Sequence, residues 1–305
     1  MSTGIASVGE CMLELSGAGE GQWRMGFAGD TFNTLWALKA LSGRDCDYVS
    51  AFGDDPFSKD QIAFLDHHGI GIAASPIIAG ARPGLYAISL TGAERSFTYW
   101  RSDSAARRLA DDAAALGRSL GGRALVYFSG ITLAILDQPG RDALIAAIRD
   151  ARAGGSLIAF DPNYRPRLWT DADGARAAFS AAYGVTDVAL PTFPDEQTLF
   201  GDPTPHATAD RLLESGIGEV IVKDGENPAL VAVGANRETV RAISVSAVDT
   251  TGAGDSFNGA YLAARLSGDQ PIEAAHRAHR VAAAVVQVRG ALAVVEVLQT
   301  AFAQG

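Results

Sequence analysis

Residues 248–258 are Val248-Asp249-Thr250-Thr251-Gly252-Ala253-Gly254-Asp255-Ser256-Phe257-Asn258, and they carry the strongest indication of fold and function in the chain. The two glycines allow a tight turn with outward-facing amides, and the residues after them predict a helix. Free amides at a helix N-terminus favour an anion such as phosphate. An acidic side chain at the same point favours removal of a proton from a hydroxyl that attacks that phosphate. The stretch therefore predicts phosphoryl transfer with Asp255 as the base.

The same residues also fit a simpler interpretation. Glycines form ordinary turns, and Asp255 or Ser256 could simply cap the helix that follows. From these residues alone, the two interpretations stay open.

Composition predicts a cytoplasmic globular enzyme or binding protein. Of the 305 residues, 48% are hydrophobic and 20% are charged, which is too apolar for a disordered chain. The net charge of −10 would repel nucleic acid and anionic membranes, so neither is an expected partner. Two cysteines, Cys11 and Cys46, cannot form a disulfide framework. The N-terminus has no basic residue before Glu10, which argues against a secretory signal.

Short β-branched runs alternate with longer amphipathic stretches through most of the chain. The expected strands are residues 5–8, 48–52, 124–129, 157–161, 185–190 and 220–223, and the expected helices include 57–68, 140–153 and 172–183. After Phe257 the pattern is nearly all helical. This alternation predicts an α/β fold with a mostly parallel central sheet that helices cover on both faces.

Two intervals break the alternation and predict a small β-sheet lid. Residues 84–90 and 95–101 form a predicted hairpin around Thr91-Gly92-Ala93-Glu94, and residues 13–27 are similarly short and flanked by glycine. We expect lid segments at about 11–28 and 82–102, which join as an antiparallel sheet above the carboxyl ends of the main strands. Surface hairpins without a role in binding are the alternative.

Two common nucleotide-binding motifs are missing. None of the lysines, Lys39, Lys59 and Lys223, follows a glycine, so the chain has no P-loop. The first predicted strand also lacks a following dinucleotide fingerprint. The Walker mechanism is therefore excluded, and the missing fingerprint argues against nicotinamide-dependent dehydrogenase chemistry.

Polar residues near the predicted strand ends supply candidate ligand contacts. In the motif Gly29-Asp30-Thr31-Phe32-Asn33, Gly29 permits close approach of a substrate, and Asp30 and Asn33 can bind its hydroxyls. A plain helix cap by Asp30 or Thr31 remains the alternative.

Three further groups of residues are candidates for binding. Arg165, between two prolines, is suited to a carboxylate or phosphate, although a surface pairing with Asp161 fits as well. Tyr86, Tyr99 and Arg101 are expected on one face of the hairpin. Lys223 and Gly225, at another strand end, are candidates for nucleotide phosphates and for close backbone approach to the nucleotide.

Taken together, these motifs resemble the ribokinase-type (PfkB) carbohydrate kinases. Residues 249–257 are similar to the C-terminal signature of that family, and residues 28–33 are similar to its N-terminal one. The resemblance implies one three-layer α/β/α ribokinase-like domain over residues 1–305. Further motifs are similar to 2-keto-3-deoxygluconate (2-dehydro-3-deoxygluconate) kinases: Tyr99-Trp100-Arg101, Ser129-Gly130-Ile131-Thr132, Asp161-Pro162-Asn163-Tyr164-Arg165-Pro166 and Val222-Lys223.

The resemblance implies ATP-dependent phosphorylation of a sugar-acid hydroxyl, with Mg²⁺ accompanying the nucleotide. Asp255 would be the base, and the amides of Gly252, Ala253 and Gly254 would stabilise the transferring phosphoryl group. Substrate contacts are implied for Gly29, Asp30, Asn33, Tyr86, Tyr99, Arg101, Ile131 and Arg165, and nucleotide contacts for Asn163, Lys223, Gly225, Gly252 and Gly254. A homo-oligomer formed through the lid is also expected.

The chain departs from the family pattern at three places. Ala28 replaces a glycine, Ala291 offers no polar group, and the N-x-x-E element is Thr192-Phe193-Pro194-Asp195, followed by Glu196. Either Asp195 or Glu196 could replace the usual glutamate, so the metal ligands stay unassigned. Two rival functions remain: a kinase for fructose or another sugar, and a non-catalytic sugar or nucleotide sensor.

Overall fold

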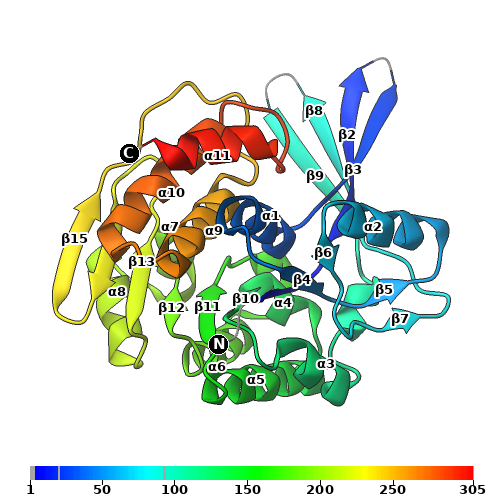
Figure 1. Ribbon diagram of the computed structural model, residues 1–305, viewed down its shortest axis with the longest axis horizontal. Helices are drawn as coiled ribbons and strands as arrows, with labels where there is room; N and C mark the ends of the chain where they lie inside the picture. Colours follow the sequence, from blue (N-terminus) through cyan, green and yellow to red (C-terminus); the bar gives the residue numbers. More distant parts are fainter. Residues whose placement is uncertain (1–3, 20, 92–93, 305) are drawn as a thin grey trace.

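The computed structural model of the protein describes residues 4–19, 21–91 and 94–304. Its main sheet has nine strands in the order β15-β14-β13-β12-β11-β10-β1-β4-β6 (Figure 1). The strands are parallel except β14 and β15, which continue the sheet in antiparallel pairing. Their bounds are β1 (Ile5–Val8), β4 (Cys46–Val49), β6 (Ile70–Gly71), β10 (Leu125–Ser129), β11 (Leu157–Asp161), β12 (Val188–Ala189), β13 (Glu219–Val222), β14 (Ala229–Val233) and β15 (Asn236–Val240).

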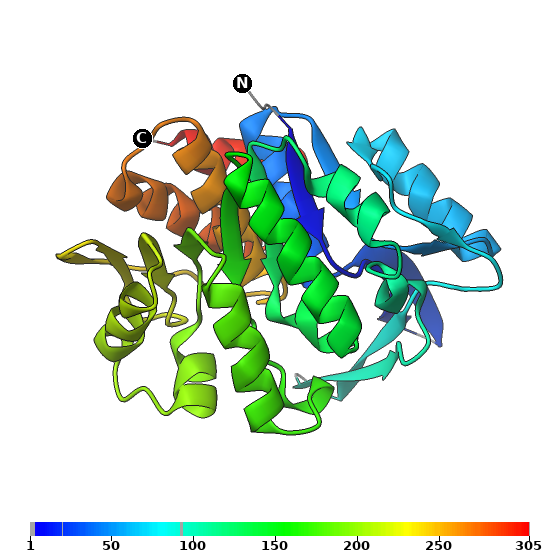
Figure 2. The same cartoon turned by 90° about the horizontal axis from the view of Figure 1, so that it is seen from below.

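Helices cover both faces of this sheet and produce the predicted three layers. Alternate side chains of β10 point to opposite faces, so Phe128 belongs to one apolar cluster and Tyr127 to the other. The first face carries α3 (Ala113–Leu120), α4 (Gly130–Ile135), α5 (Gln138–Ala153), α6 (Ala172–Tyr183), α7 (Phe193–Phe200) and α8 (Pro205–Glu214). The second carries α1 (Asp30–Ser42), α2 (Pro56–His67), α9 (Ala253–Leu266), α10 (Pro271–Val285) and α11 (Val295–Ala303). In the second view, green helices lie in front of the strands and the orange and red ones lie behind (Figure 2).

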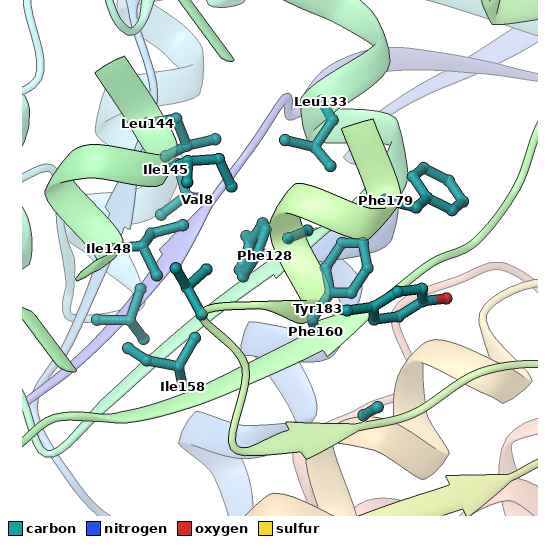
Figure 3. Packing of buried hydrophobic residues seen from close by; sticks show 14 of the residues in the cluster. Val8, Phe128, Leu133, Leu144, Ile145, Ile148, Ile158, Phe160, Phe179 and Tyr183 are labelled. Carbon is teal, nitrogen blue, oxygen red and sulfur yellow. The ribbon is translucent and has the colours of Figure 1, made fainter. Parts of the chain in front are cut away.

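Aromatic packing on the first face fixes the two central strands. The rings of Phe128 and Phe160 lie 4.6 Å apart, and Phe160 meets Tyr183 of α6 edge-on at 5.5 Å (Figure 3). Offset and edge-to-face pairs of this kind add to the apolar burial of the same side chains. This core holds the carboxyl ends of β10 and β11, where Ser129 and Asp161 lie.

A second sheet contains the two predicted lid hairpins. Its order is β3 (Gln22–Ala28), β2 (Met12–Gly19), β8 (Leu85–Thr91) and β9 (Glu94–Trp100). Each hairpin is antiparallel, but β2 and β8 pair in parallel, so the prediction of an antiparallel sheet was wrong at that junction. Both strands run outward from the same base, which makes parallel pairing the natural contact between the hairpins. The predicted turn residues Gly92 and Ala93 lie outside the described residues.

The lid sheet has two chemically different faces. Strand alternation places Glu14, Tyr86 and Tyr99 side by side on one face. Tyr86 packs there in a small cluster with Met12, Ala28, Ile88 and Ala291. The opposite face presents Trp23 and Trp100, which are about half exposed.

Smaller elements complete the structure. The predicted strand at 48–52 is divided, since β4 ends at Val49 and β5 (Phe52–Gly53) pairs instead with β7 (Ile77–Ile78). Two short 3₁₀ helices, η1 (Ala105–Arg108) and η2 (Pro166–Leu168), follow the lid and β11. Cys11 and Cys46 are free and buried. Across the described ranges, no helix combines the length and apolar character needed to cross a bilayer.

Candidate active site

The N-terminus of α9 presents unpaired amides, as the sequence predicts. Gly252 precedes the helix with φ 75°, and no side chain caps this end, so the alternative of a capping aspartate or serine was wrong. The first helical bond joins Ser256 N to Gly252 O at 2.8 Å. The amides of Gly254 and Asp255 come before it and therefore have no partner within the helix. Ala253 differs from the prediction, because its amide already donates to Thr250 O at 3.3 Å.

Only glycine fits at position 252. Its positive φ is unfavourable for other residues, and a Cβ there would lie 2.7 Å from the carbonyl oxygen of Ala291. Asp249 holds the same two loops together, because its carboxylate accepts from Thr251 N at 3.0 Å and from Gly290 N at 2.8 Å. The amides at the start of α9 are therefore fixed before any ligand binds.

Close packing of α1 against α9 brings the N-terminal motif to the same point. A Cβ at Gly259 would lie 2.5 Å from the carbonyl oxygen of Thr34, so this glycine lets the two helices approach. Asn33 then donates from Nδ2 to Asp255 Oδ2 at 2.8 Å and accepts from Gly29 N at 3.3 Å. Gly29, like Gly252, leaves no space for a side chain, because its Cβ would lie 2.1 Å from the Glu10 carbonyl oxygen. Predicted residues Gly29, Asn33 and Asp255 are thus brought together.

The environment of Asp255 suits a general base that works near neutral pH. Burial raises its pKa to about 7, and the negative charges of Asp30 and Asp161 act in the same direction. The hydrogen bond from Asn33 and the charge of Lys223 oppose that rise in the pKa. A carboxylate with this pKa accepts a proton far more readily than an ordinary aspartate does.

Asp30 connects this helix pair to the end of β11. Its Oδ2 accepts from Asn163 Nδ2 at 2.9 Å, so it does not act as a helix cap. Asn163 has a positive φ of 37° and also donates from its backbone N to Asp161 Oδ1 at 3.0 Å. A strained backbone held by two hydrogen bonds is typical of a functional turn.

A buried polar cluster lies behind these residues and contains Lys223. The Lys223 ammonium donates to Asp161 Oδ2 at 2.9 Å and to Asn258 Oδ1 at 3.0 Å. Asn258 in turn donates to Asp161 Oδ2 at 2.6 Å and to the Tyr127 hydroxyl at 3.2 Å. Lys223 is only 8% exposed, so in this state its charge is directed to Asp161 rather than to solvent.

The predicted lid residues form contacts of their own. The rings of Tyr86 and Tyr99 are 5.7 Å apart on the face described above, which confirms that they share a face. The Tyr86 hydroxyl donates to the Glu14 carboxylate. Arg101 is buried and forms an ion pair with Glu10 at the base of the lid. No hydrogen bond between these lid residues and Asp255 is found among the described residues.

The remaining candidates lie on the body. Arg165 is exposed and lies 3.4 Å from Asp195, so its predicted alternative pairing with Asp161 was wrong. Ile131, on α4, is half-buried against the core. Gly225 has φ 59° in the turn after β13, which explains the glycine there.

The structure separates the two candidates for the metal-associated carboxylate. Glu196 is fully buried and binds the Tyr183 hydroxyl and Arg211, so it belongs to the core. Asp195 is half-buried, pairs with Arg165, and has a pKa raised mainly by burial. The start of α7 lies beside the end of β13, because Phe193 N donates to Lys223 O at 2.8 Å, and the charges of Asp161 and Lys223 also influence the pKa of Asp195. No group of three or more metal-binding side chains occurs within the described part of the chain.

Sequence reasoning missed several residues of this network. Asp161 and Asn258 both lie inside recognised motifs, Asp161 at the end of a strand and Asn258 one helical turn after Asp255. The helical spacing from Asp255 could therefore have indicated Asn258. Tyr127 and Glu10 gave no comparable signal, because their partners are distant in sequence.

Comparison with known proteins assigns the chain to a family. The model for pfkB family carbohydrate kinases matches residues 2–297. The chain is 39% identical to a 2-dehydro-3-deoxygluconokinase of Dickeya dadantii (strain 3937), over 96% of this chain and 98% of that protein. It is 37% identical to one of Escherichia coli (strain K12), over 96% and 97%.

Solved structures agree with this assignment. A putative ribokinase II from E. coli superposes with a TM-score of 0.87 in its apo form and 0.85 in complex with ATP and Mg²⁺. Both structures are 26% identical to this chain, and the alignments cover 99% of each chain. The predicted ribokinase-like fold is therefore confirmed, and the chain belongs to the pfkB family of carbohydrate kinases.

Proposed function

We propose that this kinase transfers the terminal phosphoryl group of ATP to 2-keto-3-deoxygluconate and forms 2-keto-3-deoxy-6-phosphogluconate. The observation that carries the proposal is the meeting of the Asp255 carboxylate with the unpaired amides at the start of α9. The similarity to named 2-dehydro-3-deoxygluconokinases over nearly the full chain supports the choice of sugar.

Asp255 accepts the proton of the primary hydroxyl while that oxygen attacks the terminal phosphorus of ATP. The hydrogen bond from Asn33 orients the carboxylate, and its raised pKa suits proton transfer near neutral pH. The amides of Gly254 and Asp255, together with the helix dipole, stabilise negative charge on the transferring group. Removal of one such preorganised donor typically lowers the rate by on the order of 10²-fold or more.

The sugar acid lies between the body and the inner face of the lid in this proposal. Gly29, Asp30 and Asn33 contact its hydroxyls from α1, and Tyr86, Tyr99 and Ile131 contact its chain. Arg101 and Arg165 supply the positive groups that a carboxylate requires and a neutral sugar does not. Exposed Arg165 donates to the Tyr164 carbonyl oxygen at 2.9 Å, and its contact with Asp195 is longer at 3.4 Å, so it can exchange the Asp195 contact for the substrate.

The nucleotide occupies the side of the site formed by Asn163, Lys223, Gly225 and the α9 amides. Mg²⁺ in such sites keeps several waters and binds one or two carboxylates plus phosphates, so a single half-buried Asp195 fits that need. Asp195 would therefore help to hold the ion, which neutralises phosphate charge when bound. The buried contacts of Glu196 with Tyr183 and Arg211 favour Asp195 over Glu196 for this role.

The outer face of the lid is proposed as a contact between two copies of the chain. Trp23, Met25 and Trp100 lie on this face and are 45–56% exposed. Trp23 and Trp100 line a groove of about 1120 Å³ whose lining also includes the apolar Leu15 and Ala87 and charged residues such as Arg82 and Asp103. Exposed large apolar side chains on one face of a sheet are typical of association surfaces.

Release of ADP, measured across acidic and neutral sugars, tests the choice of substrate. We expect kcat/KM for 2-keto-3-deoxygluconate to exceed that for fructose by at least about 10²-fold. Arg165→Ala should raise KM for the acid by about tenfold or more and barely change the values for fructose, since only the acid offers a charged partner.

The two rivals predict other results in the same assay. A kinase for fructose or a similar ketose would prefer the neutral sugar and would be insensitive to Arg165→Ala. A sensor would bind sugar or ATP and release no ADP with any sugar.

A further inference from the structure

Glu10 and Arg101 meet where the lid joins the body. Glu10 lies between β1 and β2, where the chain leaves the main sheet, and Arg101 directly follows β9, where it returns. Gly84, just before β8, lies at the same junction. A Cβ on Gly84 would be 2.5 Å from Glu10 Oε1 and 3.1 Å from Arg101 Cβ. Three of the four crossings of the chain between body and lid therefore converge on this ion pair.

Both charged groups of the pair are buried, so each one needs the opposite charge of its partner to be stable there. Glu10 is 2% exposed and Arg101 is 9% exposed, and Arg101 Nη2 donates to Glu10 Oε2. A buried charge without a partner is strongly unfavourable, whereas a pair in good geometry is tolerated. Glu10 therefore fixes the position of a guanidinium that would otherwise move toward solvent.

The pair is incompletely bonded. Glu10 Oε1 and Arg101 Nε are both buried, and neither finds a hydrogen-bond partner among the described residues. Buried polar atoms in native proteins are nearly always paired, so this junction has capacity for one more polar group. A guanidinium that keeps a free N–H can still bind a ligand carboxylate.

We propose that Glu10 is a positioning residue that holds Arg101 in the orientation in which it receives the substrate carboxylate. This inference rests on the proposed function, because it needs an acidic sugar that contacts Arg101. Glu10 itself touches neither the sugar nor ATP. Its effect therefore falls on binding of the sugar acid and leaves the phosphoryl-transfer step to Asp255.

Steady-state kinetics of Glu10→Gln tests the proposal. We expect KM for 2-keto-3-deoxygluconate to rise about tenfold or more, with KM for ATP and kcat within about twofold of wild type. Gly84→Ala should act in the same direction, because its Cβ displaces the Glu10 carboxylate without changing any charge. It also serves as the test variant if Glu10→Gln does not fold.

Glu219→Gln is the matched control. Glu219 is also a buried glutamate that binds an arginine, Arg265 at 2.9 Å, but it lies on β13 away from the lid. This variant should lower the midpoint of thermal unfolding and leave KM for the sugar acid unchanged.

A double-mutant cycle separates positioning from a purely structural role. If Glu10 acts through Arg101, Glu10→Gln adds no further rise in KM in an Arg101→Ala background. A folded Glu10→Gln with wild-type KM, or fully additive effects of the two changes, would overturn the inference alone. A wild-type enzyme that does not phosphorylate 2-keto-3-deoxygluconate would overturn this inference together with the proposed function.

Discussion

At the scale of single residues, the proposed mechanism depends on the protonation of Asp255. Burial and the charges of Asp30 and Asp161 raise its pKa to about 7, so this carboxyl group would change its protonation close to neutral pH. Asn33 donates an N–H to the carboxylate and so favours the ionised form. The neighbours of Asp255 thus set its pKa.

The dependence of kcat/KM on pH should report this tuning. Because Asp255 accepts a proton, activity should fall as pH decreases through about 7 in the free enzyme. Asp30→Asn removes a charge that raises the pKa, so the acidic limb should move to lower pH. An acidic limb that stays in place in Asp30→Asn would contradict the assignment.

The contribution of Asp255 to the free energy of unfolding changes with pH in the opposite direction to activity. An aspartate with a raised pKa stabilises the fold below its ordinary pKa of about 4, and that contribution is lost as pH rises to about 7. In Asp255→Asn, the free energy of unfolding should therefore decline less between these pH values than in wild type. Urea titrations at several pH values measure this difference.

At the scale of secondary-structure elements, two helix N-termini build the site. The starts of α1 and α9 meet because Gly259 lets the helices pack closely, and Gly252 lets the chain enter α9. Alanine substitutions at Gly252 and at Gly254 should distinguish a glycine that the backbone conformation requires from a glycine that a ligand requires for close approach. Gly252→Ala should lower both stability and activity, because its Cβ would lie 2.7 Å from the Ala291 carbonyl oxygen.

Gly254→Ala is the matched comparison. No atom lies within 4 Å of a Cβ at this position, so thermal unfolding should be unchanged or slightly improved. A fall in kcat with normal stability would show that a phosphoryl group approaches this turn closely. If both variants kept wild-type turnover, the α9 N-terminus would not be the site of transfer.

The elements themselves could be predicted well where the pattern was regular. The helix at 172–183 and the strand at 157–161 have the predicted bounds, because capping residues and buried alternation mark them locally. The strand expected at 185–190 contains only Val188–Ala189 in ladder pairing, since register with β11 and β13 decides its length. The residues of this segment alone do not predict its register with the neighbouring strands.

The site was predictable in its motifs but not in its contacts. Asp255, Asn33 and Gly29 were predicted from glycine-rich helix starts, which local sequence shows. The pairings of Lys223 with Asp161 and of Arg101 with Glu10 join residues 62 and 91 positions apart. Only the completed sheet and lid bring those charges together, so spacing along the chain could not reveal them.

At the scale of the whole molecule, the proposed function gives the two faces of the lid different roles. One face carries Tyr86 and Tyr99 toward the α9 loop, where Tyr86 packs with Ala291. The other face exposes Trp23, Met25 and Trp100. Closure of the inner face over the sugar would exclude water and limit ATP hydrolysis.

The oligomeric state tests the role of the outer face. We expect a dimer in wild type and a monomer in the double variant Trp23→Glu/Met25→Glu, because buried charges oppose an apolar contact. Light scattering coupled to size exclusion measures the mass. Lys59→Glu, on α2, is a control that should leave the mass unchanged. A wild-type monomer, or a double variant that stays dimeric, would show that this face is not the contact.

The central claim is that Asp255 is the proton acceptor in phosphoryl transfer to the sugar. Single-turnover transfer from labelled ATP to 2-keto-3-deoxygluconate, measured in Asp255→Asn beside calorimetric binding of the sugar, tests it most directly. We predict that the rate falls by at least about 10³-fold while sugar affinity changes by less than about threefold, because asparagine keeps the shape and loses the basic oxygen. A variant that transfers phosphate at the wild-type rate would contradict the account.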